Sequence, residues 1–168
     1  MKGLVLYSSR TGNTKRLAER IYEGLRGSGE WDLADVARGC DADGYDVVLL
    51  GGWADRGSLD GAALEAFREM DKSGKRVGLF MTMGARVDSP HGQMHTEALG
   101  ELLEGVDGLG VQTLQGSVAP AVLERLALIP DSMMPRKVKD AMEAEARSYV
   151  APTDGDYEAI VGFFRERL

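Results

Sequence analysis

YSSRTGNT, residues Tyr7–Thr14, joins a run of apolar residues to a segment with the spacing of a helix. Its serine and threonine side chains are Ser8, Ser9, Thr11 and Thr14. Gly12 lets the backbone approach a ligand closely, and the first amides of the following helix have no partner inside that helix. Hydroxyl donors beside a helix N-terminus suit a phosphate group. Since one hydroxyl is enough for a helix cap, the pattern favours phosphate binding over simple capping.

Short apolar runs alternate with helical patterns on both sides of this loop. Lys2–Ser8 predicts the first strand, and the apolar residues that follow recur at four-residue steps, as on one face of a helix. Further strands are predicted over Trp31–Ala37, Asp46–Trp53, Arg76–Met83 and Leu109–Val118, with helices between them. This alternation predicts a parallel sheet with helices on both faces, that is, a three-layer α/β/α sandwich.

The alternation loosens after the fifth predicted strand. Prolines punctuate the next thirty residues, and a separate helical stripe follows at Val138, Met142, Ala146 and Tyr149. We expect residues 120–152, approximately, to be a helical insertion before a C-terminal helix. With no repeat or low-complexity segment, residues 1–168 are expected to form a single domain.

Composition limits the class of protein. The 168 residues carry a formal net charge of −7 with basic and acidic residues interspersed, so the electrostatic footprint of a nucleic-acid binder is missing. The single cysteine, Cys40, forms no internal disulfide, and the N-terminus enters a strand pattern without a signal-peptide core. No apolar run approaches the roughly 20 residues of a membrane span. We expect a cytoplasmic protein without membrane contact, as a monomer or weak dimer.

Two further loops are expected beside the first. Ligands of open parallel sheets bind beyond the carboxyl ends of the strands. GGWADRGS (Gly51–Ser58) follows the third predicted strand, and TMGARVDSPHG (Thr82–Gly92) follows the fourth. Trp53 is suited to stack on a heteroaromatic ring, although a tryptophan ending a strand is also an ordinary core residue.

Together, SSRTGNT and these two loops resemble the flavodoxin family, whose first loop has the pattern S/T-x-T-G-N-T. The resemblance covers residues 1–118, approximately, and the last helix. More narrowly, the chain is similar to short flavodoxin-like proteins with a GGW stretch and a helical extension after strand five, some of which accompany bilirubin-reducing enzymes in anaerobic gut bacteria. The family implies a five-stranded parallel sheet of order 2-1-3-4-5 and bound flavin mononucleotide (FMN).

The resemblance also implies which residues bind FMN. The phosphate would lie in the first loop and the isoalloxazine ring between the second and third loops. The implied residues are Ser8, Ser9, Arg10, Thr11, Gly12, Asn13 and Thr14, then Gly52, Trp53, Ala54, Asp55 and Gly57, then Met83, Gly84, Ala85 and Asp88. For Asp88 a turn-forming role before Ser-Pro is an open alternative. His91, just after it, has no set of metal ligands around it, and a plain surface role is its alternative.

One departure from the family pattern concerns the second flavin face. Many flavodoxins stack a tyrosine of the third loop there, but residues 82–92 contain none. The insertion, Met81 or Met83, or a partner protein could cover that face. We hypothesise that the insertion lies at the same edge of the sheet and that Met133, Met134 or nearby residues approach the flavin. Negative charge from Asp55, Asp60 and Asp88 is expected to lower the potential of the flavin. Two arginines of the same loops, Arg56 and Arg86, work the other way.

These residues do not form a catalytic constellation for hydrolysis or acyl transfer. The leading hypothesis is an FMN-binding electron carrier, without catalytic or metal-ligating residues of its own, that works between a reductase and an acceptor enzyme. An alternative is a flavin-dependent reductase of a small acceptor such as a quinone or tetrapyrrole. A binding module without flavin is a third possibility.

Overall fold

The computed structural model describes residues 1–168 and contains the predicted parallel sheet. Its five parallel strands are β1 (Lys2–Tyr7), β2 (Glu30–Asp35), β3 (Val47–Asp55), β5 (Arg76–Met83) and β6 (Gly108–Gln115), in the order β2-β1-β3-β5-β6. The predicted order 2-1-3-4-5 is therefore confirmed. A two-residue strand, β4 (Ser58–Leu59), pairs antiparallel with the end of β3 and was not predicted, because two residues are too few to show a periodicity.

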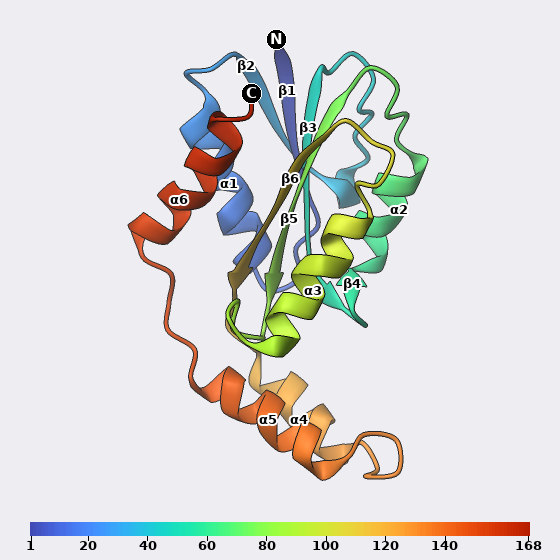
Figure 1. Cartoon of the computed structure of the whole chain (residues 1–168), viewed down its shortest axis with the longest axis vertical. Helices are drawn as coiled ribbons and strands as arrows, with labels where there is room; N and C mark the ends of the chain where they lie inside the picture. The colour runs from blue at the N-terminus through green and yellow to red at the C-terminus, as the bar shows by residue number, and fades with distance from the viewer.

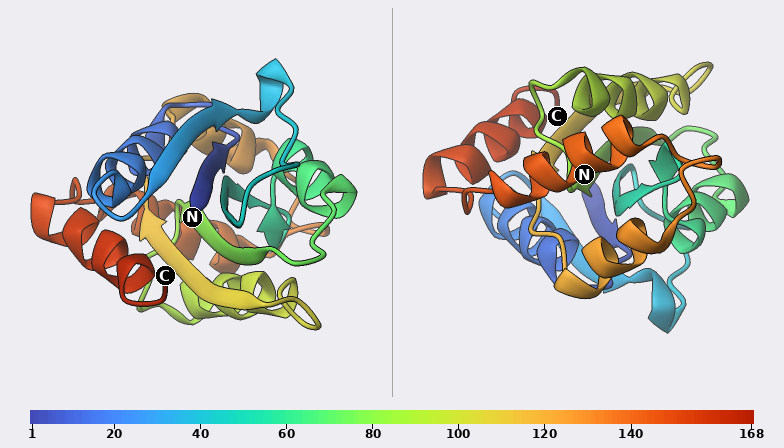
Figure 2. Two further views of the ribbon diagram at one scale, coloured as in Figure 1. Left: turned by 90° about the horizontal axis from the view of Figure 1, so that it is seen from above. Right: turned by 90° about the horizontal axis from the view of Figure 1, so that it is seen from below.

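Helices cover both faces of the sheet (Figure 1). Helices α1 (Asn13–Leu25) and α6 (Asp154–Arg165) lie side by side on one face, and α2 (Gly61–Glu69) and α3 (Pro90–Glu101) lie on the other (Figure 2). Because successive side chains of a strand point to opposite faces, the side chains of β1 contribute alternately to two apolar cores. Val5 and Tyr7 belong to the core under α1 and α6, and Leu4 and Leu6 to the other. The three-layer prediction is confirmed.

The ends of three strands differ from the predicted ends. Strand β2 stops at Asp35, because its carboxylate accepts a hydrogen bond from the Ala37 amide at 2.9 Å and caps the 3-10 turn η1 (Val36–Arg38). Strand β6 stops at Gln115, three residues early. Strand β3 continues two residues beyond Trp53 because β4 supplies partners for that extension.

Helices α4 (Pro120–Leu128) and α5 (Arg136–Arg147) lie across the carboxyl ends of the strands (Figure 1). We call these two helices and the residues between them the cover. Only Leu126 and Lys139 are buried in these two helices. Lys139 Nζ donates to the Ile129 carbonyl at 2.6 Å and to Asp131 at 2.5 Å, which ties α5 to the turn before it. The cover is thus a lightly packed element placed at the ligand-binding edge of the fold.

None of the helices combines the length and the apolar character needed to cross a lipid bilayer.

Candidate functional site

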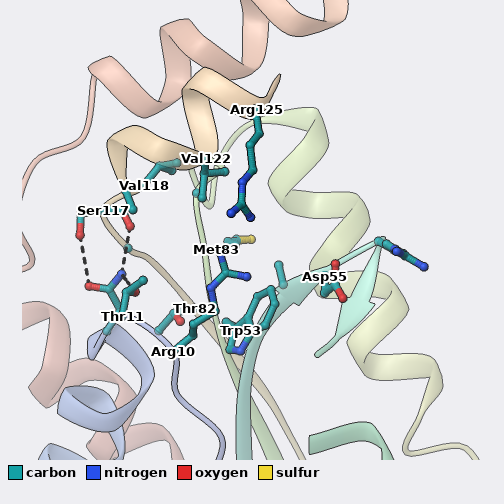
Figure 3. Close-up of a pocket in the computed structure, with 16 residues that line it drawn as sticks. Arg10, Thr11, Trp53, Asp55, Thr82, Met83, Ser117, Val118, Val122 and Arg125 are labelled. Atoms are coloured by element: carbon teal, nitrogen blue, oxygen red, sulfur yellow. Dashed lines mark hydrogen bonds between the residues drawn. The ribbon is translucent and has the colours of Figure 1, made fainter. Parts of the chain in front are cut away.

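A pocket of about 510 Å³ opens at the carboxyl edge of the sheet, between four loops and the cover (Figure 3). We call it the Trp53 pocket. Its lining residues are Arg10, Thr11, Asn13, Trp53, Ala54, Asp55, Arg56, Thr82, Met83, Gly84, Gly116, Ser117, Val118, Ala119, Val122 and Arg125. This volume is typical of a cofactor site, and the location is the one at which parallel sheets bind ligands.

Two of the four hydroxyls of the first loop are used inside the protein. Ser8 Oγ donates to Asp60 Oδ1 at 2.8 Å, and Thr14 Oγ1 lies 2.8 Å from Thr82 Oγ1 with Thr14 only 1% exposed. Asp60, 2% exposed, also accepts from the amides of Trp53 and Ala63. Ser8 and Thr14 therefore fix the loop to its neighbours. Asp60, which we had expected near the ring, is a buried cap of α2.

The rest of the first loop leaves the start of α1 available to an anion. Gly12, at the N-cap of α1, has a left-handed backbone (φ 96°), and no side chain caps this helix. In contrast, Asp60, Ser89 and Thr153 cap α2, α3 and α6. Unpaired amides at a helix N-terminus attract negative charge. Thr11 lines the pocket here, while Ser9 shapes the loop by accepting from the Gly12 amide at 3.2 Å.

Trp53 forms a wall of the pocket rather than part of either apolar core. Its ring is half-buried, and the Arg10 guanidinium lies 5.2 Å from the ring centre (Figure 3). The backbone behind it is tied to Asp60, whose carboxylate accepts from the Trp53 amide at 3.1 Å and whose amide donates to the Trp53 carbonyl at 2.8 Å. The aromatic face is thus held at the site by a rigid strand end.

The third loop reaches the pocket only with its first residues. Met83 and Gly84 line it, but Ala85 faces a neighbouring cavity. Asp88 lies outside both, because its carboxylate forms a two-pronged ion pair with Arg86 at 3.0 and 2.6 Å. Hydrogen bonding to that guanidinium lowers the pKa of Asp88. The structure therefore does not place Asp88 where we expected it, beside a bound ring.

Gly57 also lies away from the lining. It has φ 86° in the turn between β3 and β4, next to Arg56 at φ 47°, and so helps to form the turn that carries Arg56, an exposed residue of the lining. Of the sixteen predicted site residues, the lining includes Arg10, Thr11, Asn13, Trp53, Ala54, Asp55, Met83 and Gly84. The other eight shape the loops behind it or, as with Asp88, point elsewhere.

A fourth loop, after β6, was missed by our reading of the sequence. Gly116–Ala119 line the pocket opposite Trp53, and Gly116 lies so close to Asn13 that an added Cβ would be 2.7 Å from Asn13 Nδ2. The rule that ligands bind beyond the strand ends applies equally to the fifth parallel strand and would have identified this loop. Val122 and Arg125, from α4, carry no such signal in the sequence.

The pocket is electropositive although the chain is acidic. Arg10, Arg56 and Arg125 line it without forming any ion pair, and Asp55 is the one acidic residue among the lining. Asp60 and Asp88, the other two carboxylates expected near the ring, are not part of the lining. The positive charge of the three arginines attracts an anionic ligand.

The cover lies at the edge that we expected, but other residues of it reach the pocket. Met133 is 79% exposed, and Met134 lines the neighbouring cavity instead. Val122 and Arg125 take the place proposed for these methionines, and Arg125 points toward Met83 (Figure 3). The insertion therefore lies at the predicted edge, whereas neither Met133 nor Met134 lines the Trp53 pocket.

Comparison with known proteins agrees with this arrangement. The chain is 36% identical over 141 residues to the flavodoxin-like domain-containing protein BilS of Clostridioides difficile (strain CD3), covering 79% of this chain and 78% of that protein. Its fold resembles a Streptococcus pneumonia TIGR4 flavodoxin (TM-score 0.62, 13% identity, 99% and 97% covered). It also resembles a Lactobacillus acidophilus NCFM flavoprotein solved in complex with FMN (TM-score 0.51, 19% identity, 67% and 92% covered).

At these identities the two solved structures show the fold alone, whereas the sequence matches are specific. The model of the flavodoxin domain matches residues 4–165, nearly the whole chain. Together with the identity to the C. difficile protein, this match shows that the chain belongs to the flavodoxin family.

Proposed function

We propose that this protein binds FMN in the Trp53 pocket and transfers electrons between redox partner proteins. One observation carries the proposal: an uncapped helix N-terminus and the half-buried ring of Trp53 lie at the same pocket of about 510 Å³. The helix end suits the phosphate of FMN and the indole suits its ring. The solved flavoprotein of the same fold with FMN bound supports this choice of cofactor.

The residues have distinct roles in this proposal. Thr11 and the first amides of α1 hold the phosphate, and Arg10, whose guanidinium lies over the Trp53 ring, adds a positive charge to the pocket. Trp53 and the backbone of Met83 and Gly84 position the ring. FMN supplies the redox chemistry, and the protein supplies orientation and electrostatics. The arginines favour anionic states of whatever ligand they face, so they raise the affinity for a dianionic phosphate.

A titration of the purified flavin-free protein tests the cofactor. FMN should bind and quench tryptophan emission, and riboflavin, which lacks the phosphate, should bind at least tenfold more weakly, because each charge-assisted hydrogen bond contributes about 1.5–3 kcal/mol. Thr11→Ala should weaken FMN binding and leave riboflavin unchanged. Ser73→Ala, exposed in the turn before β5 at the other edge of the sheet, is the control. Equal binding of FMN and riboflavin would contradict the proposed phosphate site.

The partner proteins are inferred from the function and not from a docking surface. A reductase would supply electrons and an acceptor enzyme would receive them, and the link to bilirubin-reducing enzymes stays a prediction. Reduction of the FMN-loaded protein by a flavodoxin reductase, followed by reoxidation on adding an acceptor enzyme, is the expected behaviour.

A second candidate function, reduction of a small acceptor, has one observation in its favour. The cover encloses an apolar cavity that adjoins the Trp53 pocket, which gives a small molecule access to the same site. Steady turnover of NAD(P)H with a quinone, without any other protein present, would support this candidate. Absence of turnover, together with rapid electron exchange with a partner protein, favours the carrier.

A further inference from the structure

A second cavity, of about 400 Å³, lies between the cover and the end of the sheet. We call it the cover cavity. It has six lining residues in common with the Trp53 pocket, namely Ala54, Met83, Gly84, Val118, Val122 and Arg125. The two spaces therefore share a wall, and a molecule in one lies next to a molecule in the other.

The walls of the cover cavity are mainly apolar. Eleven of its sixteen lining residues are hydrophobic, and they come from the strand end (Met83), from α4 (Leu126) and from α5 (Met142). Methionine side chains adapt to ligands of different shape, because they are unbranched and polarisable. A cavity of this size and lining suits a small apolar molecule held by a few polar contacts.

The polar groups of the cavity are mostly satisfied within the protein. Glu145 Oε2 accepts from the Arg86 amide at 3.1 Å and from the Ser89 hydroxyl at 3.4 Å. The Nε2 atoms of His91 and His95 lie 3.0 Å apart and share a hydrogen bond. Arg125 is different: it is exposed, its side chain forms neither an ion pair nor a hydrogen bond with the protein, and its guanidinium points toward Met83 on the shared wall (Figure 3). A carboxylate is a natural partner for such a guanidinium.

His95 provides a second observation at the same cavity. Its side chain is 8% exposed and lines the cavity, and its Nδ1 atom is buried without a hydrogen-bond partner. The Gly57 backbone, which is not part of the cavity lining, lies within hydrogen-bonding reach of this imidazole, so His95 faces the β3–β4 turn as well as the cavity.

From these features we propose that the cover cavity is a binding site for a small apolar carboxylic acid. The apolar body lies among Leu126, Met134 and Met142, and the carboxylate pairs with Arg125. Because Arg125 stands on the shared wall, the bound acid would lie beside whatever occupies the Trp53 pocket. The inference does not require that this occupant be FMN.

Calorimetric titration with 2-naphthoate tests the proposal, with its uncharged analogue 2-naphthamide as the comparison. The wild-type protein should bind one equivalent of the acid, at least tenfold more tightly than the amide. Arg125→Gln should remove this preference, so that the acid binds as weakly as the amide. Equal affinities in the wild-type protein, or an unchanged preference in Arg125→Gln, would overturn the assignment of the carboxylate to Arg125.

A matched pair of variants on α5 tests the location. Ala146 lines the cover cavity, whereas Ala144, two residues before it, is exposed and absent from the lining. Ala146→Phe should fill the cavity and abolish binding of 2-naphthoate, and Ala144→Phe should bind like the wild-type protein. Circular dichroism of both variants checks that α5 is intact. Full binding by Ala146→Phe would show that the acid binds elsewhere.

The two proposals fail separately. Ala146 does not line the Trp53 pocket, so Ala146→Phe should keep the wild-type affinity for FMN while it loses the acid. If the wild-type protein binds the acid but not FMN, the proposed function is contradicted and the proposed acid site in the cover cavity is not. If it binds FMN but not the acid, only the proposed acid site is contradicted.

Discussion

The side-chain amide of Asn13 donates a hydrogen bond to the main-chain oxygen of Ser117 at 3.1 Å, and the Ser117 hydroxyl donates to Asn13 Oδ1 at 3.4 Å. The pair joins the first turn of α1 to the loop after β6, 104 residues later in the chain. Both loops line the Trp53 pocket, and Gly116 allows them to approach each other. The pocket is therefore closed on this side by side-chain bonds between loops rather than by the sheet.

Replacing Asn13 by alanine should open this side of the pocket. The change removes both bonds, and each is expected to contribute about 0.5–1.5 kcal/mol. Hydrogen exchange should show faster exchange of the amides of residues 116–119, and the affinity for FMN should fall several-fold. Ser117→Ala, which loses only the longer bond, should have a smaller effect. Unchanged exchange in Asn13→Ala would mean that the loop is held by other contacts.

Gly51 is expected to be the least tolerant glycine of the sheet. A Cβ added at Gly51, in the buried part of β3, would overlap the ring of Phe80 on the neighbouring strand. Gly51→Ala should lower the free energy of unfolding by about 3 kcal/mol, the upper end of the cost of overpacking a core, because the ring of Phe80 is fully buried and enclosed by its neighbours.

Gly162→Ala serves as the control for that measurement. It lies inside α6 with nothing near its added Cβ, so alanine should stabilise the protein by about 0.5–1 kcal/mol through helix propensity. Urea denaturation of both variants gives the two values. A Gly51→Ala variant as stable as the wild-type protein would show that Phe80 moves aside freely.

Lys139 should hold the cover together. The side chain is 6% exposed and bonds to Ile129 and Asp131, so Lys139→Met removes its charge and leaves the Ile129 carbonyl without this donor. Amides of α4 and α5 should then exchange faster, while those of the strands keep their protection, because the cover contributes little to the core. Lys137→Met, an exposed lysine without a partner on the same helix, should behave like the wild-type protein.

Stability should depend on pH through His95. Burial, and next the neighbouring His91, lower the pKa of this imidazole from its usual value of 6.5. As the pH falls through about 6.5, the unfolded chain binds a proton that the folded chain does not, so the free energy of unfolding decreases. Above that pH both states are neutral and the contribution is complete. The other ionisable residues lining this cavity are Arg125 and Glu145.

Urea unfolding between pH 7.5 and pH 5.5 measures this effect. His95→Gln should remove most of the decrease and so flatten the pH profile, whatever its own stability at pH 7.5. Identical slopes for the two proteins would assign the decrease to other groups.

The sheet and its first loop were predictable because their signals are local. Buried parallel strands such as β3 and β5 read as continuous apolar runs, and the loop hydroxyls stand next to each other in the sequence. The hydrogen-bond partners of those hydroxyls were not predictable. Ser8 bonds to Asp60, 52 residues away, and Thr14 to Thr82, 68 residues away, so their roles depend on strand order and register.

Arg125 shows the limit most clearly. Its helix has no counterpart in the alternating pattern, and only the folding of the cover across the strand ends brings the guanidinium to Met83 (Figure 3). Asp88 shows the opposite error: a residue in the expected loop is turned away because Arg86, two positions earlier, pairs with its carboxylate. The placement of such side chains depends on long-range packing and on local ion pairs, and the hydrophobic periodicity of the sequence reveals neither.

The light packing of the cover has an evolutionary consequence. Because α4 and α5 bury only Leu126 and Lys139, most of their positions can mutate without a large loss of folding stability. Helix α4 supplies part of the wall of both cavities, and α5 supplies part of the wall of the cover cavity. Natural variation in this segment can therefore give related proteins new ligand preferences while the sheet and its first loop stay unchanged.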